Sequence, residues 1–163
     1  MTTIENPNVQ AIRQQLRVAY NDLNALLDNP ISGLEPEQLY RPAAPGEWSI
    51  MENLAHINEF LPYWADEVSK LVAHPGQNFG RTMKHEGRLR AIEEHGHDTL
   101  EQARAALPKN YAYVDGVLSK LTDSDLELTG HHVTYGERTL AWFIDEFLVR
   151  HVAAHVEQIK GCL

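Results

Sequence analysis

Apolar residues recur at steps of three and four in four separate segments of this 163-residue chain, and sustained alternation of apolar and polar residues is absent. Steps of three and four place side chains on one face of an α-helix, whereas alternation is typical of a strand. The four segments span residues 7–28, 49–73, 98–121 and 139–160. The sequence therefore predicts an all-α fold in which four principal helices pack as a four-helix bundle.

Local signals mark the starts of three of these helices. Asn6-Pro7 precedes the first, as an N-cap residue followed by proline at the first helical position. Ser49 and Glu52 fit a capping box, in which each side chain bonds the backbone N–H of the other residue. Asp98, followed by a glutamate three residues later, fits the same pattern at the third helix. These signals support helices that begin near residues 7, 49 and 98.

The connections between the helices differ in length. Residues 74–97 form a polar stretch that can travel the length of a bundle. A connection of this kind permits its flanking helices to be parallel. We therefore expect a long crossover connection between the second and third helices. Residues 31–47 form a connection with one helical turn at 36–39, and residues 122–138 form a loop or a short hairpin.

Composition limits the partners of such a bundle. A chain of this length fits one domain over residues 1–163, and its 43% apolar content supplies a core. The net charge of −9 repels phosphate backbones and anionic membranes, so we expect no nucleic acid and no membrane partner. Cys162 is the one cysteine and cannot form an internal disulfide. Together with the absence of an export or membrane-spanning segment, this favours a cytoplasmic location.

Two histidines share the apolar face of the fourth predicted helix. His151 and His155 are one turn apart, the spacing that lets two imidazoles bind one metal ion. A third ligand must come from another helix, and His56 in the second helix is the best candidate. A histidine on an apolar face is more often a hydrogen-bonded core residue than a ligand. Spacing alone therefore leaves metal binding and a structural role open.

Two motifs resemble those of a known family. Glu47-Trp48-Ser49 followed by Leu54-Ala55-His56-Ile57 is similar to the W-S…H-aliphatic segment of the DinB-like proteins. Residues 151–159, HVAAHVEQI, are similar to their H-x-x-x-H-x-x-Q-I helix. The two motifs have the order and separation of that family, and the resemblance covers nearly the whole chain.

The resemblance implies a DinB-like four-helix bundle with one divalent metal ion, most often zinc, nickel or iron, held by three histidines. Carried over by motif, these ligands are His56, His151 and His155. It also implies frequent homodimers. Characterised branches of the family include thiol S-transferases and isomerases that use small thiols such as bacillithiol or mycothiol. The resemblance thus implies a small-molecule thiol and an electrophile as partners.

Other polar residues are candidates for supporting roles. Gln158 is expected on the buried stripe beside His155, and Glu59 lies one turn after His56, with Glu52 and Tyr63 as weaker candidates. Basic residues of the crossover are candidates to receive the carboxylates of a thiol: Arg81, Arg88 and Arg90. The remaining histidines in connections are expected to be solvated: His85, His95, His97, His131 and His132.

Three functions remain compatible with such a site. The preferred interpretation is a metal-dependent transferase that activates a low-molecular-weight thiol towards a small electrophile. The second is a metal-binding dimeric stress protein without turnover. The third is metal-assisted hydrolysis, for which a base such as Glu59 would have to face the metal. No catalytic residue beyond this candidate follows from the sequence.

Overall fold

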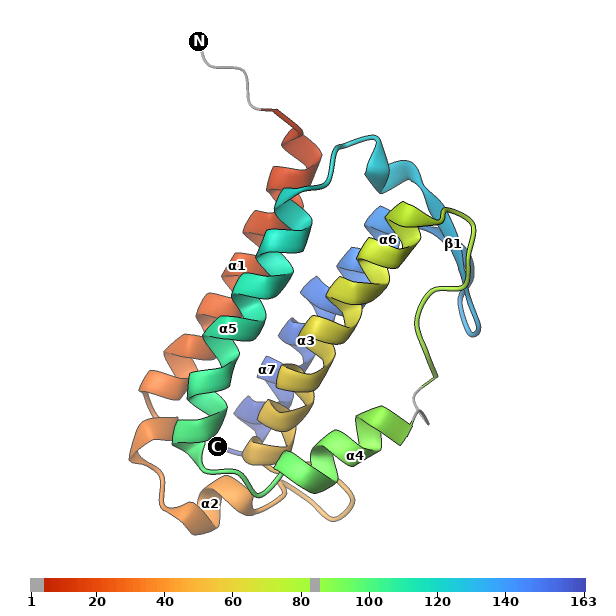
Figure 1. The fold of residues 1–163 in the computed structure, drawn as a ribbon. Coiled ribbons are helices and arrows are strands. Elements are labelled where there is room, and N and C mark those ends of the chain that lie inside the picture. Colours follow the sequence, from red (N-terminus) through yellow and green to blue (C-terminus); the bar gives the residue numbers. More distant parts are fainter. Residues whose placement is uncertain (1–4, 83–85) are drawn as a thin grey trace.

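The computed structural model describes residues 5–82 and 86–163, and for residues 86–88 it describes the backbone alone. The fold is built around four long helical segments (Figure 1). The first three are α1 (Pro7–Asp28), α3 (Ile50–Ala73) and α5 (Leu100–Ser119). The fourth consists of α6 (Leu140–Ile144), a π-helical turn η3 (Asp145–Val149) and α7 (Arg150–Gly161). The all-α four-helix bundle is confirmed, and the π-helical turn is a feature that the apolar pattern did not predict.

The direction of the helices follows from the long crossover. Figure 1 shows α3 and α5 running the same way and α1 and α7 running the opposite way. The connection from α3 to α5 therefore returns along the bundle, and it carries α4 (Glu86–His95). The predicted crossover between the second and third long helices is confirmed. Before α3, the chain forms the short turns η1 (Ile31–Gly33) and α2 (Pro36–Tyr40), where one turn was expected.

A small hairpin closes one end of the crossover. After η2 (Asp125–Glu127), β1 (Thr129–His132) pairs antiparallel with β2 (Gly136–Thr139), so the alternative of a short hairpin is correct. The hairpin also contacts the beginning of the crossover, because the Phe79 amide donates to the His131 carbonyl at 2.8 Å. The hairpin and the beginning of the crossover are thus hydrogen-bonded to each other.

The N-terminal cap of α3 agrees with the sequence prediction, whereas those of α1 and α5 differ from it. Ser49 Oγ accepts from the Glu52 amide and Glu52 Oε1 accepts from the Ser49 amide, both at 3.1 Å, as predicted. The box at α5 is formed one residue later than expected, by Thr99 and Gln102. That pair fits the same four-residue pattern, so the pattern alone could not distinguish the two starts.

The start of α1 is capped from a distance. Asn6 occupies the expected N-cap position, but its side chain accepts from the Asp123 amide instead of capping the helix. The Asp123 carboxylate accepts from the amides of Asn8 and Val9 at 3.2 and 3.0 Å. A carboxylate at a helix N-terminus also interacts favourably with the helix dipole. The start of α1 is therefore tied to the segment after α5.

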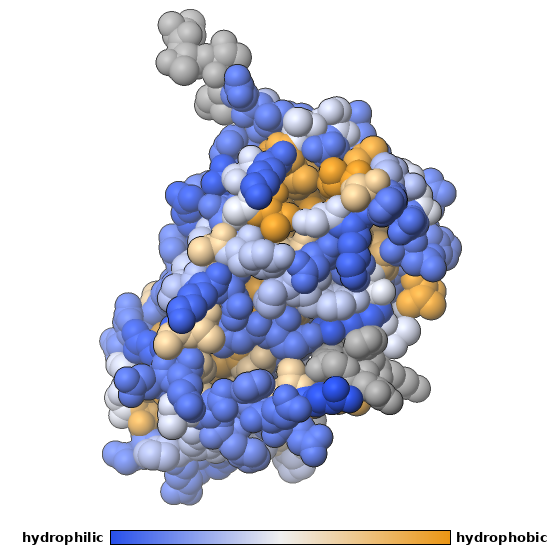
Figure 2. Space-filling view, in the orientation of Figure 1, coloured by the Kyte–Doolittle hydropathy of each residue, from blue (hydrophilic) through white to orange (hydrophobic). Residues whose placement is uncertain are grey.

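The core fills the space between the four helical segments, and the face of the molecule shown in Figure 2 is mostly polar. Aromatic rings make up much of the core between α3, the crossover and the fourth segment: Trp64 stacks on Phe147 at 4.2 Å, and Phe79 stacks on Phe143 at 4.3 Å between ring centroids. In the described part of the chain, no helix combines the length and apolar character that crossing a bilayer requires.

Candidate metal centre

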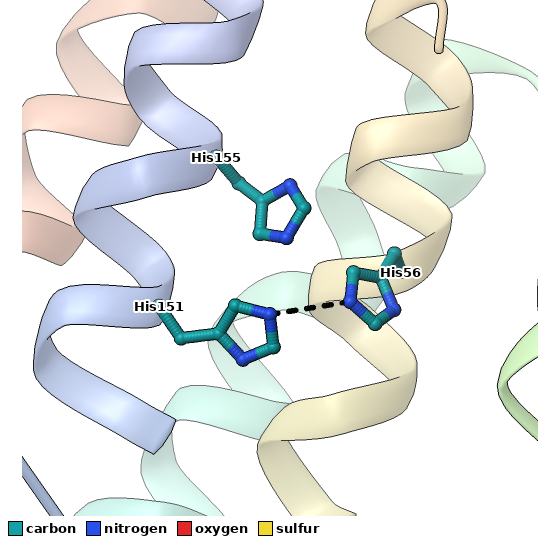
Figure 3. Close-up of side chains that lie close together, drawn as sticks. All are labelled: His56, His151 and His155. Atoms are coloured by element: carbon teal, nitrogen blue, oxygen red, sulfur yellow. Dashed lines mark hydrogen bonds between the residues drawn. The ribbon is translucent and has the colours of Figure 1, made fainter. Parts of the chain in front are cut away.

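Three histidines from two helices point towards one another (Figure 3). His56 comes from α3, and His151 and His155 come from α7. One ligand atom from each ring lies within 4.8 Å of the other two, and the Nε2 atoms of His56 and His151 are 3.3 Å apart. The structure thus brings together the three residues that the family motifs select.

The π-helical turn determines which face of α7 meets α3. The buried residues of the fourth segment include a series at every fourth position: Leu140, Ile144, Leu148, Val152 and Val156. In an uninterrupted α-helix with 3.6 residues per turn, a four-residue step drifts by about 40° each time. The wider turn at residues 145–149 offsets part of this drift. It ends one residue before α7, which carries His151 and His155, and so sets the direction in which both histidines point.

His155 is held by an amide that lies entirely inside the protein. Asn53 has no exposed surface, and its Oδ1 lies 2.8 Å from His155 Nδ1. The Asn53 Nδ2 donates to the Ser49 carbonyl at 2.9 Å, which fixes the direction of the amide and leaves Oδ1 as the acceptor. His155 therefore carries its proton on Nδ1 and presents the Nε2 lone pair to the cluster.

His151 is oriented by its own helix. Its Nδ1 lies 3.2 Å from the carbonyl oxygen of Phe147, one turn earlier and within the π-helical turn. A carbonyl can only accept, so Nδ1 carries the proton and Nε2 the lone pair. The orientation of His151 therefore also depends on the π-helical turn.

His56 faces a charged pair on its other side. Glu59 Oε2 is 3.6 Å from His56 Nδ1, a charge contact rather than a hydrogen bond. Arg81 from the crossover binds both oxygens of Glu59, at 2.5 and 2.6 Å, and lies over the Tyr63 ring with its guanidinium carbon 3.8 Å from the centroid. Burial acts to raise the pKa of Glu59, but His56 and Arg81 outweigh it and hold the pKa at about 2. Glu59 is therefore an anion, which favours the proton on Nδ1 of His56.

The three imidazoles fit a divalent ion. Each Nδ1 faces an oxygen acceptor, so each Nε2 is directed to the cluster in the form that a metal requires. Two nitrogens about 2.1 Å from one ion at a tetrahedral angle lie about 3.4 Å apart. The 3.3 Å between the Nε2 atoms of His56 and His151 is close to that value. The donor set, its protonation and its spacing therefore all suit a three-histidine metal site.

A cavity of about 670 Å³ opens beside His56 and His151. Aromatic side chains from three parts of the fold contribute to its wall: Trp64 of α3, Phe147 of η3 and Tyr135 of the hairpin turn. The crossover contributes Arg81, and α7 contributes Arg150. This volume is within the range of small-molecule sites, and the cavity borders two of the three histidines.

The structure changes the supporting roles that the sequence suggested. Gln158 is exposed and does not lie on the buried stripe, so the prediction that it supports His155 was wrong. Asn53 has that position, and sequence reasoning missed it. The available signal was an asparagine among apolar neighbours near the start of α3, three residues before His56. Glu52 forms the helix cap and Tyr63 lies under Arg81, so neither contacts the cluster through the interactions described.

The basic residues expected to receive a carboxylate are placed differently from one another. Arg81 lines the cavity, but its side chain is 6% exposed and its guanidinium is already bound to Glu59. Arg90 lines a separate cavity of about 370 Å³ between α3, α4 and α5. The side chain of Arg88 lies outside the described residues. Arg150, which sequence reasoning did not select, lies 3.6 Å from Glu146 at the edge of the larger cavity.

One histidine outside the cluster is buried against expectation. His132 is only 2% exposed, and its Nδ1 accepts from the amides of Thr134 and Tyr135 at 3.0 and 3.3 Å. It therefore holds the hairpin turn and is not solvated as predicted. His95 is exposed beside Asp98, and His131 is exposed. The side chain of His85 lies outside the described residues.

The fold and the cluster together define a class of helical bundle with a three-histidine centre between its second and fourth long helices. The family follows from the sequence: the chain belongs to the DinB superfamily, whose model matches residues 7–159. No protein of curated function matches the chain in sequence.

Solved structures show the same fold at low sequence identity. YfiT from Bacillus subtilis, described as a probable metal-dependent hydrolase with an unusual four-helix bundle topology, is 15% identical with a TM-score of 0.78, over 99% of this chain and 89% of that one. The four-helix bundle protein TT2238 is 19% identical with a TM-score of 0.65, over 93% and 98%. The colibactin self-resistance protein ClbS, solved in complex with double-stranded DNA, is 14% identical with a TM-score of 0.56, over 91% and 93%.

Proposed function

We propose that this protein binds one divalent metal ion through His56, His151 and His155 and uses it to transfer a low-molecular-weight thiol to a small electrophile. The observation that carries the proposal is the arrangement of the ring nitrogens: three Nδ1 atoms face oxygen acceptors while one ligand nitrogen of each ring meets the other two. Such an arrangement leaves a divalent ion its full charge and open coordination positions. The adjoining cavity supplies space for a small molecule.

The ion, when bound, supplies a positive charge that lowers the pKa of a nearby thiol. The reaction then balances as a substitution. The thiol sulfur provides the electron pair of a new S–C bond, the leaving group departs with the pair of the bond that breaks, and the thiol proton passes to water. No oxidant or reductant is required.

The chain contributes position rather than acid–base chemistry in this proposal. Asn53, Glu59 and the Phe147 carbonyl hold the three imidazoles in one tautomer. Glu59 lies on the Nδ1 side of His56, away from the Nε2 atom that faces His151. We therefore assign Glu59 as a positioning residue and not as the general base considered from the sequence.

Hydrolysis is the second candidate, because one observation favours it. Glu146 lines the same cavity as His56 and His151, and a carboxylate there is a candidate base for water. YfiT, with the same fold, carries the description of a metal-dependent hydrolase. Thiol and water are alternative nucleophiles at one site, so a single set of assays compares them.

The test combines metal analysis with a screen of nucleophiles. Purified protein loaded with Zn²⁺, Ni²⁺ or Fe²⁺ is mixed with small thiols and 1-chloro-2,4-dinitrobenzene, and with ester substrates in the absence of thiol. We expect stoichiometric metal and a thiol-dependent rate that disappears on chelation and returns with metal. Metal binding without any turnover would overturn the enzyme proposal and favour a metal-binding protein without catalysis. Activity that persists in metal-free protein would overturn the metal-dependent mechanism.

We also propose a homodimer and no nucleic-acid partner. The net charge of −9 opposes binding to a phosphate backbone. The DNA complex of ClbS concerns a protein that is 14% identical and shares the fold. Sedimentation of the protein alone and with a double-stranded DNA fragment tests both statements, and co-sedimentation at physiological salt would contradict the second.

A further inference from the structure

Two cavities meet at the histidine cluster. The first, of about 670 Å³, is lined by His56 and His151. The second, of about 700 Å³, is lined by His151 and His155 and extends to Trp48 and Glu47 in the segment before α3. His151 and Ala154 belong to both walls. The cluster therefore borders two cavities, and a substitution reaction has two substrates that each need a place to bind.

We propose that the two cavities separate the two substrates, with the thiol in the cavity beside His155 and the electrophile in the cavity beside His56. This inference rests on the proposed function and adds to it where each substrate lies and what kind of thiol is accepted. A sulfur in one cavity and an electrophilic carbon in the other can meet at the cluster. Neither substrate then has to pass the other to enter.

The walls of the cavities support this assignment. The first has aromatic rings from Trp64, Tyr135 and Phe147, which suit an apolar or planar electrophile. The second has small residues at Ala43, Gly46 and Gly161, which leave room for a flexible chain. Only one indole, that of Trp48, contributes an aromatic ring to the second wall besides the histidines, among the side chains that the structure describes.

The charges of the walls determine the class of thiol. Among the described lining residues of the first cavity, both carboxylates have a basic partner: Glu146 lies near Arg150, and Glu157 binds Lys160 at 2.8 Å. Arg81 in the same wall is bound by Glu59. In the second cavity Glu47 is the one charged group, apart from the histidines, among the described lining residues. A carboxylate without a basic neighbour in that wall attracts cations. The thiol is therefore one that carries an ammonium group, not one recognised through carboxylates.

Steric variants test the location of the thiol. Ala43 lines only the second cavity and Ala153 only the first, and both residues are exposed, so a larger side chain is compatible with the fold. Thiol binding to Co²⁺-loaded protein is followed by the change in the visible absorption of the ion. We expect A43W to weaken the binding of 2-mercaptoethanol at least tenfold and A153W to leave it unchanged. A153W should instead raise the KM of the electrophile.

Charge variants test the class of thiol. The probes are thiocholine, which is cationic and cannot chelate through nitrogen, and 2-mercaptoethanesulfonate, which is anionic. We expect the native protein to prefer thiocholine by about fivefold, as for one exposed charge pair. E47Q should abolish the preference, and E157Q, a matched carboxylate variant in the first cavity, should keep it.

The outcomes distinguish this inference from the proposed thiol transfer on which it rests. Failure of every thiol to change the spectrum of the native Co²⁺ protein would overturn both. Binding that is blocked by A153W and not by A43W would leave the thiol transferase standing and overturn the assignment of the cavities. A preference for thiocholine that survives E47Q would overturn the role of Glu47.

Discussion

His155 and His56 contribute to one cluster, yet the protein holds their outer nitrogens in different ways. His155 meets a neutral amide, Asn53, which is fully buried and anchored to the Ser49 carbonyl within the same helix start. His56 meets a carboxylate, Glu59, which depends on Arg81 from the crossover. The amide needs no counter-charge, whereas a buried carboxylate does. The amide of Asn53 is thus anchored within its own helix, whereas the carboxylate of Glu59 requires Arg81 of the crossover to be docked.

We expect the largest effect when a histidine ligand is removed from either side of the cluster. We expect H155A and H56A each to abolish stoichiometric metal, because two imidazoles cannot replace three. H131A is the matched control, since His131 is exposed outside the cluster. Metal content after gel filtration, measured by elemental analysis, decides the matter. Full occupancy in both cluster variants would show that the ion lies elsewhere.

The buried amide is expected to matter next. N53L removes the acceptor of His155 Nδ1 and the donor to the Ser49 carbonyl while keeping a similar volume. We expect unfolding free energy to fall by about 1–3 kcal/mol and metal affinity to fall about 10–100-fold. Urea unfolding of the metal-free protein and competition with a zinc chelator measure the two effects separately. Unchanged zinc affinity in N53L would contradict the positioning role of Asn53.

Substitutions of Glu59 and Arg81 should have smaller effects than N53L, and the two should be coupled because Glu59 depends on Arg81 from the crossover. R81M leaves the partly buried Glu59 without its partner, and we expect a loss of about 2 kcal/mol in unfolding free energy. E59Q should lower metal affinity about tenfold. The double variant should recover stability relative to R81M, because no uncompensated carboxylate remains. A double-mutant cycle on the metal-free protein measures this coupling, and simple additivity would argue against it.

A second ion pair, far from the cluster, is less buried than Arg81–Glu59, and we expect a smaller effect there. Arg13 binds Asp115 between α1 and α5 at 2.8 and 3.0 Å. The hydrogen bond from Arg13 lowers the pKa of Asp115, so the pair stabilises the fold above the unfolded pKa of about 3.9 and is lost as pH falls through the lower folded value. D115N should cost less than about 1 kcal/mol at pH 7, with the difference from native protein vanishing in acid. Thermal unfolding from pH 7 to pH 3 tests this.

The sequence predicted those features that depend on local pattern. The limits of α1 coincide with the predicted residues 7–28, and the capping box of α3 forms as expected, because both follow from spacing along one segment. The supporting residue of His155 was missed because it lies on another helix. A uniform 100° per residue assigned Gln158 to the buried face, but the π-helical turn changes the angle between the two ends of that segment. Such a turn leaves no clear signal in apolar spacing.

The π-helical turn has a consequence for how the H-x-x-x-H motif should be interpreted across relatives. Five π-helical residues turn through about the same angle as four α-helical residues, so deleting one residue within 145–149 and restoring α-helical winding would leave the following helix facing nearly the same way. His151 and His155 would stay one turn apart, and the motif would remain intact on the page. The pair would also still point towards His56. A one-residue gap aligned to this short stretch is therefore compatible with an intact three-histidine site, whereas the loss of a histidine is not.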